Sequence, residues 1–190
     1  MMHGDELLKN LGPLAGLAGV WEGDKGDDVA PSDDRGTEFN KFRERITFEP
    51  FGPVNNHEQT LFGLRYATEA VRIGEVDPFH EERGYWLWDA LDQQVIRSFL
   101  VPRGIAVIAG GTVQAGASSF KLKATLGSPT YGICSSVFLD REFKTMGYEL
   151  EVKILSPNSF SYAEDTQIML KGKKDLFHHR DSNTLMRVGY

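Results

Sequence analysis

The sequence predicts an all-β protein: a single closed, antiparallel, up-and-down β-barrel of about ten strands, preceded by a short helical segment. Three observations predict this fold. Apolar and polar residues alternate with a period of two along most of the 190 residues. Turn-forming Gly, Pro, Asn and Asp separate the alternating segments, and no helix-sized segment lies between them, so antiparallel neighbours are expected. A meander of this length hides its strand edges completely by closing; a β-sandwich is the alternative.

The helical lead-in is expected at residues 1–18. The stretch DELLKNL has the composition of one or two helical turns, and Gly12-Pro13 should end it. PLAGLAG is expected to form another short turn before the first strand. Residues 19–190 are then predicted to form one barrel domain.

The first strand is expected around GVWEGDKG, where Trp21 lies between Gly19 and Gly23. We interpret Trp21 as a plug at one barrel end, with the glycines allowing close backbone approach. The acidic stretch DKGDDVAPSDDRGTE, residues 24–38, breaks the alternation. We interpret it as an exposed loop between the first and second strands.

The remaining strands follow from the alternation. FRERITF places Phe42, Ile46 and Phe48 on one face, and SFKLKATL and YELEVKIL alternate equally clearly. Further strands are predicted, in chain order, at EQTLFGLRYATEAV, GYWLWDAL, QVIRSFLV, GIAVIAGGTV, SSVFLDREF, SFSYAEDTQIML and LFHHRDSNTLMRV.

Composition narrows the function. The net charge of −6 and the lack of a basic cluster argue against nucleic acid and anionic membranes as partners. A single cysteine, Cys134, excludes an internal disulfide and is interpreted as a small buried hydrophobe in a strand. The start of the chain lacks a basic region followed by an apolar run, so we expect a cytoplasmic protein. The only protein partner we expect is a second copy of the chain, as a homodimer.

Three groups of residues carry candidate chemistry. His80 precedes an aromatic strand, and a lone histidine in a turn is more often a surface residue than a ligand. The adjacent Glu81 and Glu82 are interpreted as solvated, and no catalytic residue is assigned. His178 and His179 open the last strand and should point to opposite faces, so one of them is expected to face inward.

A metal role for that histidine pair has to be weighed against a structural one. Zinc needs three or four ligands, and the Cys/His spacing of such a site is absent from the sequence. Haem iron needs only one protein ligand in an apolar slot. The structural interpretation is a polar strand start in which Asp181 and Arg187 form surface pairs.

At these residues the sequence resembles the nitrobindins and their bacterial relatives, which are haem-binding barrels with a fatty-acid-binding-protein-like fold of the lipocalin-like calycin class. The matching stretches are GVWEGDKG, TLFGLRY, FHEERGYWLWD and HHRDSNTLMRV, in the same order along the chain. The third glycine of the opening motif stands one place late, at Gly26, and the last segment is more polar than in nitrobindins.

The resemblance implies a cofactor and an activity. It places the proximal ligand of a haem b iron at His179, with His178 as the adjacent candidate, and it places His80 in the cavity. It also implies that an enzymatic activity would be the haem-dependent isomerisation of peroxynitrite to nitrate, with nitric oxide binding in the ferrous form. The alternative is a haem-free carrier or sensor of a fatty-acid-like or other hydrophobic small molecule, because barrel mouths are frequent ligand sites.

Overall fold

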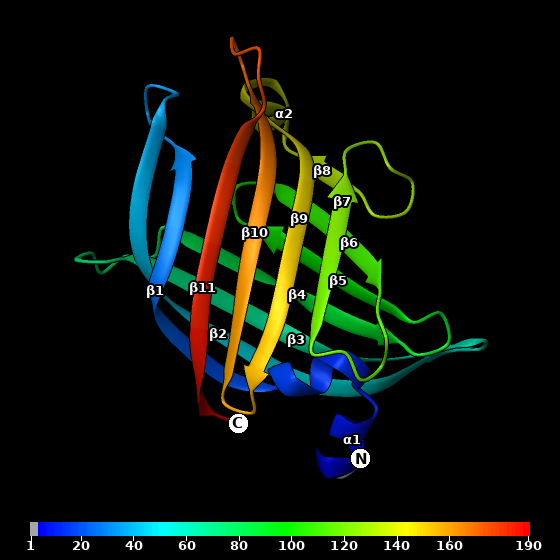
Figure 1. Cartoon of the computed structure of the whole chain (residues 1–190). Coiled ribbons are helices and arrows are strands. Elements are labelled where there is room, and N and C mark those ends of the chain that lie inside the picture. Colours follow the sequence, from blue (N-terminus) through cyan, green and yellow to red (C-terminus); the bar gives the residue numbers. More distant parts are fainter. Residues whose placement is uncertain (1–3) are drawn as a thin grey trace.

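Antiparallel strands surround one interior in the computed structural model, which describes residues 4–190 (Figure 1). Neighbouring strands pair in the order β5-β4-β3-β2-β1-β11-β10-β9-β7-β6, and pairing between β5 and β6 closes the ring. The short β8 pairs with one end of β6. The predicted closed barrel of about ten antiparallel strands is therefore confirmed. The strands are β1 (Gly19–Pro31), β2 (Thr37–Asn56), β3 (Gln59–Arg72), β4 (His80–Asp89), β5 (Gln94–Val101), β6 (Ile105–Thr112), β7 (Ser119–Thr125), β8 (Ile133–Ser135), β9 (Phe143–Ser156), β10 (Ser159–Leu170) and β11 (Phe177–Gly189).

The N-terminal helical segment closes one end of the barrel. It consists of the helix α1 (Gly4–Lys9) and the 3₁₀ helix η1 (Gly12–Leu17), which agrees with the predicted lead-in over the described residues 4–18. Leu11, Leu14 and Leu17 are fully buried against the interior. Gly12 has a φ of +53°, and a Cβ there would lie 2.5 Å from the Trp88 ring, so only glycine lets η1 sit this deep. We call this the plugged end and the opposite end the mouth.

Trp21 joins the plug to the barrel wall. Its side chain is fully buried, and its indole N–H donates a hydrogen bond to the Leu17 carbonyl at 2.7 Å. The guanidinium of Arg187 lies 4.1 Å from the Trp21 ring centre and donates hydrogen bonds to the carbonyls of Gly16 and Ala18. Arg187 therefore fastens the last strand to the plug, in contrast to the surface pair expected from the sequence.

Two predicted segments differ from the structure. The loop expected at residues 24–38 is mostly paired strand, since β1 extends to Pro31, β2 starts at Thr37 and only residues 32–36 turn. The acidic residues of this hairpin sit largely on its exposed face, where, for example, Asp27 pairs with Lys41. A high density of acidic residues is therefore compatible with strand here, because these side chains point to solvent.

The strand expected at SSVFLDREF is instead the helix α2 (Val137–Glu142). Ser136 is its N-cap, and the Ser136 hydroxyl accepts a hydrogen bond from the Leu139 amide. Cys134 lies in β8 just before this helix and is exposed, so its interpretation as a buried residue was wrong.

α2 and the β1–β2 turn both lie at the mouth (Figure 1). Arg35 in that turn forms an ion pair with Glu142 of α2 at 2.8 Å. Among residues 4–190, the structure contains no helix long and apolar enough to cross a membrane.

We predict that Trp21→Ala lowers the free energy of unfolding by about 3–5 kcal/mol, because it empties a fully buried aromatic site and removes a contact of the plug. Urea unfolding followed by circular dichroism measures the change. Phe39→Ala is the matched control, because that ring is 79% exposed and its loss should cost little. Equal effects of the two substitutions would contradict the role given to Trp21.

Candidate ligand-binding site

A cavity of about 80 Å³ lies inside the barrel. Its apolar walls include Ile46, Phe48 and Phe160, whereas ionisable and hydroxyl groups from β2, β3, β4, β5, β10 and β11 line the rest. Trp86 also lines it, and its indole N–H is the one buried side-chain polar atom of residues 4–190 that lacks a hydrogen-bond partner. Such atoms are rare in folded proteins and call for an explanation. The cavity is thus the natural place to look for a ligand.

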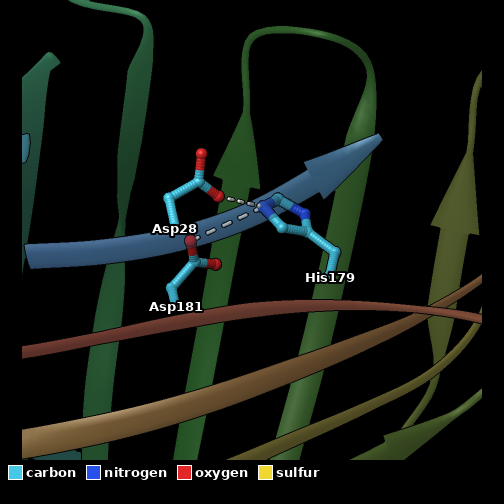
Figure 2. Close-up of side chains that lie close together, drawn as sticks. All are labelled: Asp28, His179 and Asp181. Atoms are coloured by element: carbon cyan, nitrogen blue, oxygen red, sulfur yellow. Dashed lines mark hydrogen bonds and ion pairs between the residues drawn. The ribbon is translucent and has the colours of Figure 1, made fainter. Parts of the chain in front are cut away.

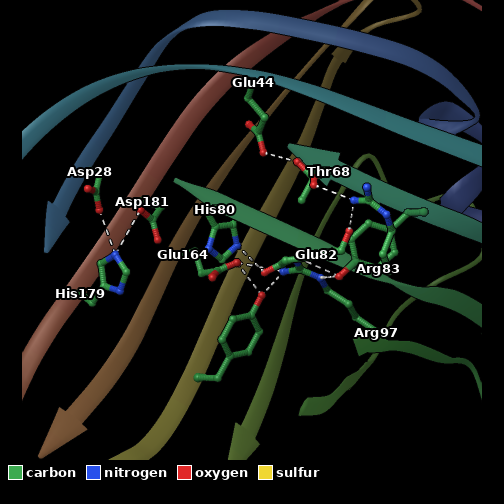
Figure 3. A network of polar contacts seen from close by, with 12 residues as sticks. Asp28, Glu44, Thr68, His80, Glu82, Arg83, Arg97, Glu164, His179 and Asp181 are labelled. Carbon is green, nitrogen blue, oxygen red and sulfur yellow. Dashed lines mark hydrogen bonds and ion pairs between the residues drawn. The ribbon is translucent and has the colours of Figure 1, made fainter. Parts of the chain in front are cut away.

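Arg97 of β5 is the centre of the polar group (Figure 3). Its guanidinium forms ion pairs with Glu82 of β4 and, at 2.9 Å, with Glu164 of β10. It also donates hydrogen bonds to the hydroxyls of Tyr66 and Tyr148. These hydroxyls in turn donate to Glu82 and Glu164, at 2.9 and 2.6 Å. Each of the three guanidinium nitrogens of Arg97 therefore already donates a hydrogen bond within the protein.

Burial and pairing together set the charges of this network. Burial raises the pKa of Glu82, but the Arg97 charge and a hydrogen bond from His80 outweigh it and lower this pKa to about 2. Burial lowers the pKa of His80, yet the contact with Glu82, at 3.2 Å, gives it a net rise. Burial raises the pKa of Glu164. The interior thus holds charged groups that satisfy one another rather than free ones.

Glu44 of β2 is the exception, because no base pairs with it. Its carboxyl group is buried and accepts hydrogen bonds from Thr68 at 2.9 Å, Tyr162 at 3.0 Å and Asn183 at 3.3 Å. Burial raises the pKa of Glu44 to about 7, although these three hydrogen bonds act in the opposite direction. Glu44 is therefore poised between its neutral and charged forms near neutral pH.

A second ionisable group, made of Asp28, His179 and Asp181, lies at the mouth (Figure 2). The His179 Nε2 atom lies 2.9 Å from Asp28 Oδ1 and 3.5 Å from Asp181 Oδ1. Burial lowers the pKa of His179, but the two carboxylates outweigh it and raise this pKa to about 10. His179 therefore carries a proton at neutral pH, and that proton is shared with Asp28 and Asp181.

A β-bulge turns Asp28 toward the interior. Between Glu22 and Asp27, β1 advances five residues while β11 advances four, and a matching shift occurs against β2. The extra residue lies between Gly23 and Gly26, which is where the opening motif has its late glycine. Because side chains alternate along a strand, this bulge places Asp28 inside and Asp27 outside.

The structure resolves which way the histidines point. His179 faces the interior and lines the cavity, whereas His178 is on the outer face, where its Nδ1 contacts Asp165 at 2.7 Å. Asp181 lies on the same face as His179 and contacts it, so the surface pair expected for Asp181 does not form. His80 lines the cavity from the start of β4, where the family resemblance placed it and not at the surface position typical of a lone histidine. Its partner Glu82 is buried, so the interpretation of Glu82 as solvated was wrong.

Sequence reasoning missed Glu44, Arg97 and Glu164. A signal was present in each strand, because these residues share the inward positions of their apolar neighbours. In FRERITF, Glu44 lies between Phe42 and Ile46, and in QVIRSFLV, Arg97 lies between Val95 and Phe99. A charged residue at an inward position marks a buried polar site when the strand closes a barrel.

Comparisons with known proteins bear on this site. The family model described as "THAP4-like, heme-binding beta-barrel domain" matches residues 10–187. Among solved structures, Rv2717c from M. tuberculosis is similar, with a TM-score of 0.64 and 20% sequence identity over 95% of this chain and 96% of that one. At this identity the likeness shows the fold alone. A search of curated proteins gave no match.

We predict that Glu44 makes the protein less stable as the pH rises from about 4.5 to 7. Its pKa is higher in the folded protein than in the unfolded chain, so the folded state binds more protons in this window and unfolding becomes easier as they leave. The contribution is on the order of 3 kcal/mol. Urea unfolding between pH 4.5 and 8 tests this, with Glu44→Gln expected to lose that part of the pH dependence. An unchanged profile in Glu44→Gln would contradict the assignment.

Proposed function

The chain belongs to the THAP4-like, heme-binding β-barrel family, and from this premise we propose that it binds a small molecule whose polar head donates a hydrogen bond to Glu44. Family membership supports a ligand-binding barrel. The observation that carries the finer proposal is the unpaired carboxyl group of Glu44 on the cavity wall. The body of the ligand would lie against the apolar wall near Phe48 and Phe160.

The free energy needed to bury so many charged groups supports a binding role for the interior. Apolar residues of similar volume would serve the fold as well as buried ion pairs do, or better, because removing charges from water costs several kcal/mol per ion. The network of Glu82, Arg97 and Glu164 nevertheless fills the centre of the barrel. Perturbed ionisable groups around a cavity are characteristic of binding and catalytic sites.

The charges of the lining favour a head group that is neutral or cationic. Carboxyl groups outnumber bases on the cavity wall, and each base is paired with at least one carboxylate. A carboxylate ligand would therefore find no free cation, which argues against a fatty acid. The groups are the carboxyls of Glu44, Glu82, Glu164 and Asp181 and the bases His80, Arg97 and His179.

Haem b ligated by His179 is the second candidate, favoured by the family and by the position of His179 on the last strand. The residues as they are arranged do not fit it. Iron needs the lone pair of a neutral imidazole, whereas His179 Nε2 is engaged by two carboxylates. The cavity of about 80 Å³ is also smaller than the roughly 300–1,000 Å³ usual for drug-sized ligands. Haem binding, and with it peroxynitrite or nitric oxide chemistry, would require a rearranged mouth.

We predict that propylamine and propanol, which are small enough for a cavity of about 80 Å³, bind at least tenfold more tightly than propanoate. The three share one apolar body, so the difference reports the head group at Glu44. Isothermal titration calorimetry at pH 7 measures it. Glu44→Gln should remove most of the preference for the amine, and Glu49→Gln, on the outer face of the same strand, should retain it. Tighter binding of propanoate would overturn the proposed head group.

We predict that the parent protein shows no histidine-ligated Soret band when titrated with haemin at neutral pH, because His179 is held by Asp28 and Asp181. A Soret band that His179→Ala removes and His178→Ala retains would instead establish haem ligation by His179. His80→Ala should then alter haem affinity while keeping the band.

A further inference from the structure

The group of Asp28, His179 and Asp181 has the composition of a metal site. We propose that these three side chains bind a divalent first-row metal ion, such as Zn²⁺ or Mn²⁺, without a porphyrin. One imidazole with two carboxylates suits these ions better than Mg²⁺, which prefers oxygen ligands throughout. The proposal does not rest on the proposed head-group site, because that site uses Glu44.

The spacing of the ligand atoms fits one ion. The candidate ligand atoms of the three residues lie within 4.8 Å of one another. Metal bonds of roughly 2.0–2.2 Å place neighbouring ligand atoms about 3 to 3.6 Å apart in octahedral or tetrahedral sites. Of the two distances from His179 Nε2, 3.5 Å lies within this range and 2.9 Å lies just below it. Figure 2 shows Nε2 directed at both carboxylates, so the position now held by its proton is the one that an ion would take.

The surroundings hold these ligands in place. The Asp28 side chain is only 1% exposed, and its second oxygen, Oδ2, accepts a hydrogen bond from Asn40 at 2.8 Å. Ligating carboxylates are commonly fixed by such a partner, which leaves the other oxygen for the metal. Asn40 and Asp28 are directly opposite in the pairing of β1 with β2, so the strand register itself sets this contact.

The strand pairing also brings two like charges together. Asp28 of β1 and Asp181 of β11 are directly opposite in an antiparallel pair, which is unfavourable without a cation between them. The protonated His179 supplies that cation here, and a bound metal ion would take over its role. The bulge in β1 creates this arrangement by turning Asp28 inward. Without the bulge, the alternation that starts at Trp21 would point Asp27 inward and Asp28 outward. The inward position of Asp28 therefore depends on the bulge.

The site would be open on one side. His179 and Asp181 line the cavity, and three protein ligands leave at least one coordination position free. A water molecule or an oxygen of a cavity ligand would complete the coordination sphere. This is the arrangement of a site that acts on a ligand rather than one that only fastens two strands.

Titration of the chelator-treated protein with Co²⁺ tests the proposal, because Co²⁺ reports inner-sphere ligands through its visible absorption. We expect one Co²⁺ per chain, displaced by Zn²⁺ and not by Mg²⁺. Asp28→Asn, His179→Ala and Asp181→Asn should each weaken binding at least 100-fold, and Asn40→Ala should weaken it about 10–100-fold. The matched control is His178→Ala, which removes the neighbouring histidine with its own aspartate contact and should bind like the parent.

Circular dichroism of each variant shows whether the barrel is folded, and the asparagine variants keep the shape of the residues they replace. The titration contains no organic ligand, so its result is independent of the amine-binding test. Absence of Co²⁺ binding, binding that survives Asp28→Asn and Asp181→Asn, or equal loss in His178→Ala would overturn the proposal. The group would then be a proton-bridged ion cluster that joins β1 to β11.

Discussion

The guanidinium of Arg97 is the group around which the interior is organised. It is buried in the centre of the barrel and reaches partners on four other strands, namely β3, β4, β9 and β10. A buried charge of this kind is tolerated only when its hydrogen bonds are satisfied, so the tyrosines and carboxylates around it are fixed in turn. Arg97 and His80 pair with Glu82 and Glu164, and His179 pairs with Asp28 and Asp181, so Glu44 is the carboxyl group of the cavity wall that has no base beside it. The head-group chemistry proposed for the ligand therefore depends on all the bases of the interior being paired elsewhere.

The two ends of the barrel differ in character: the plugged end is apolar and stabilises the fold, and the mouth carries the polar groups. At the plugged end, η1, Trp21 and Arg187 bury apolar surface and join the start of the barrel to its last strand. Toward the mouth, the interior becomes polar and ionised. A polar interior lowers the stability of the folded state, and the well-packed plugged end compensates for this elsewhere in the fold. The mouth is in turn supported by the ion pair between Arg35 and Glu142.

Much of the fold could be predicted from the sequence, because a period of two is a direct consequence of strand geometry. The same rule predicted that His178 and His179 point to opposite faces, as they do. It failed for α2, where the capping residue Ser136 carried the signal, and for the hairpin of β1 and β2, where charge was interpreted as a loop. The site was harder to predict, since Glu82 and Arg97 on the neighbouring strands β4 and β5 meet Glu164 on β10, far away in sequence. Alternation shows which way a side chain points, and only the closed barrel shows what it meets.

Both ends of the described chain lie at the plugged end (Figure 1). Gly189 pairs with Val20 beside η1, so the last strand finishes where the first one begins. A purification tag, a surface anchor or a fused domain attached at either terminus would thus extend away from the mouth. Immobilised molecules would share one orientation, with the polar opening directed at the solution and accessible to a ligand or an ion.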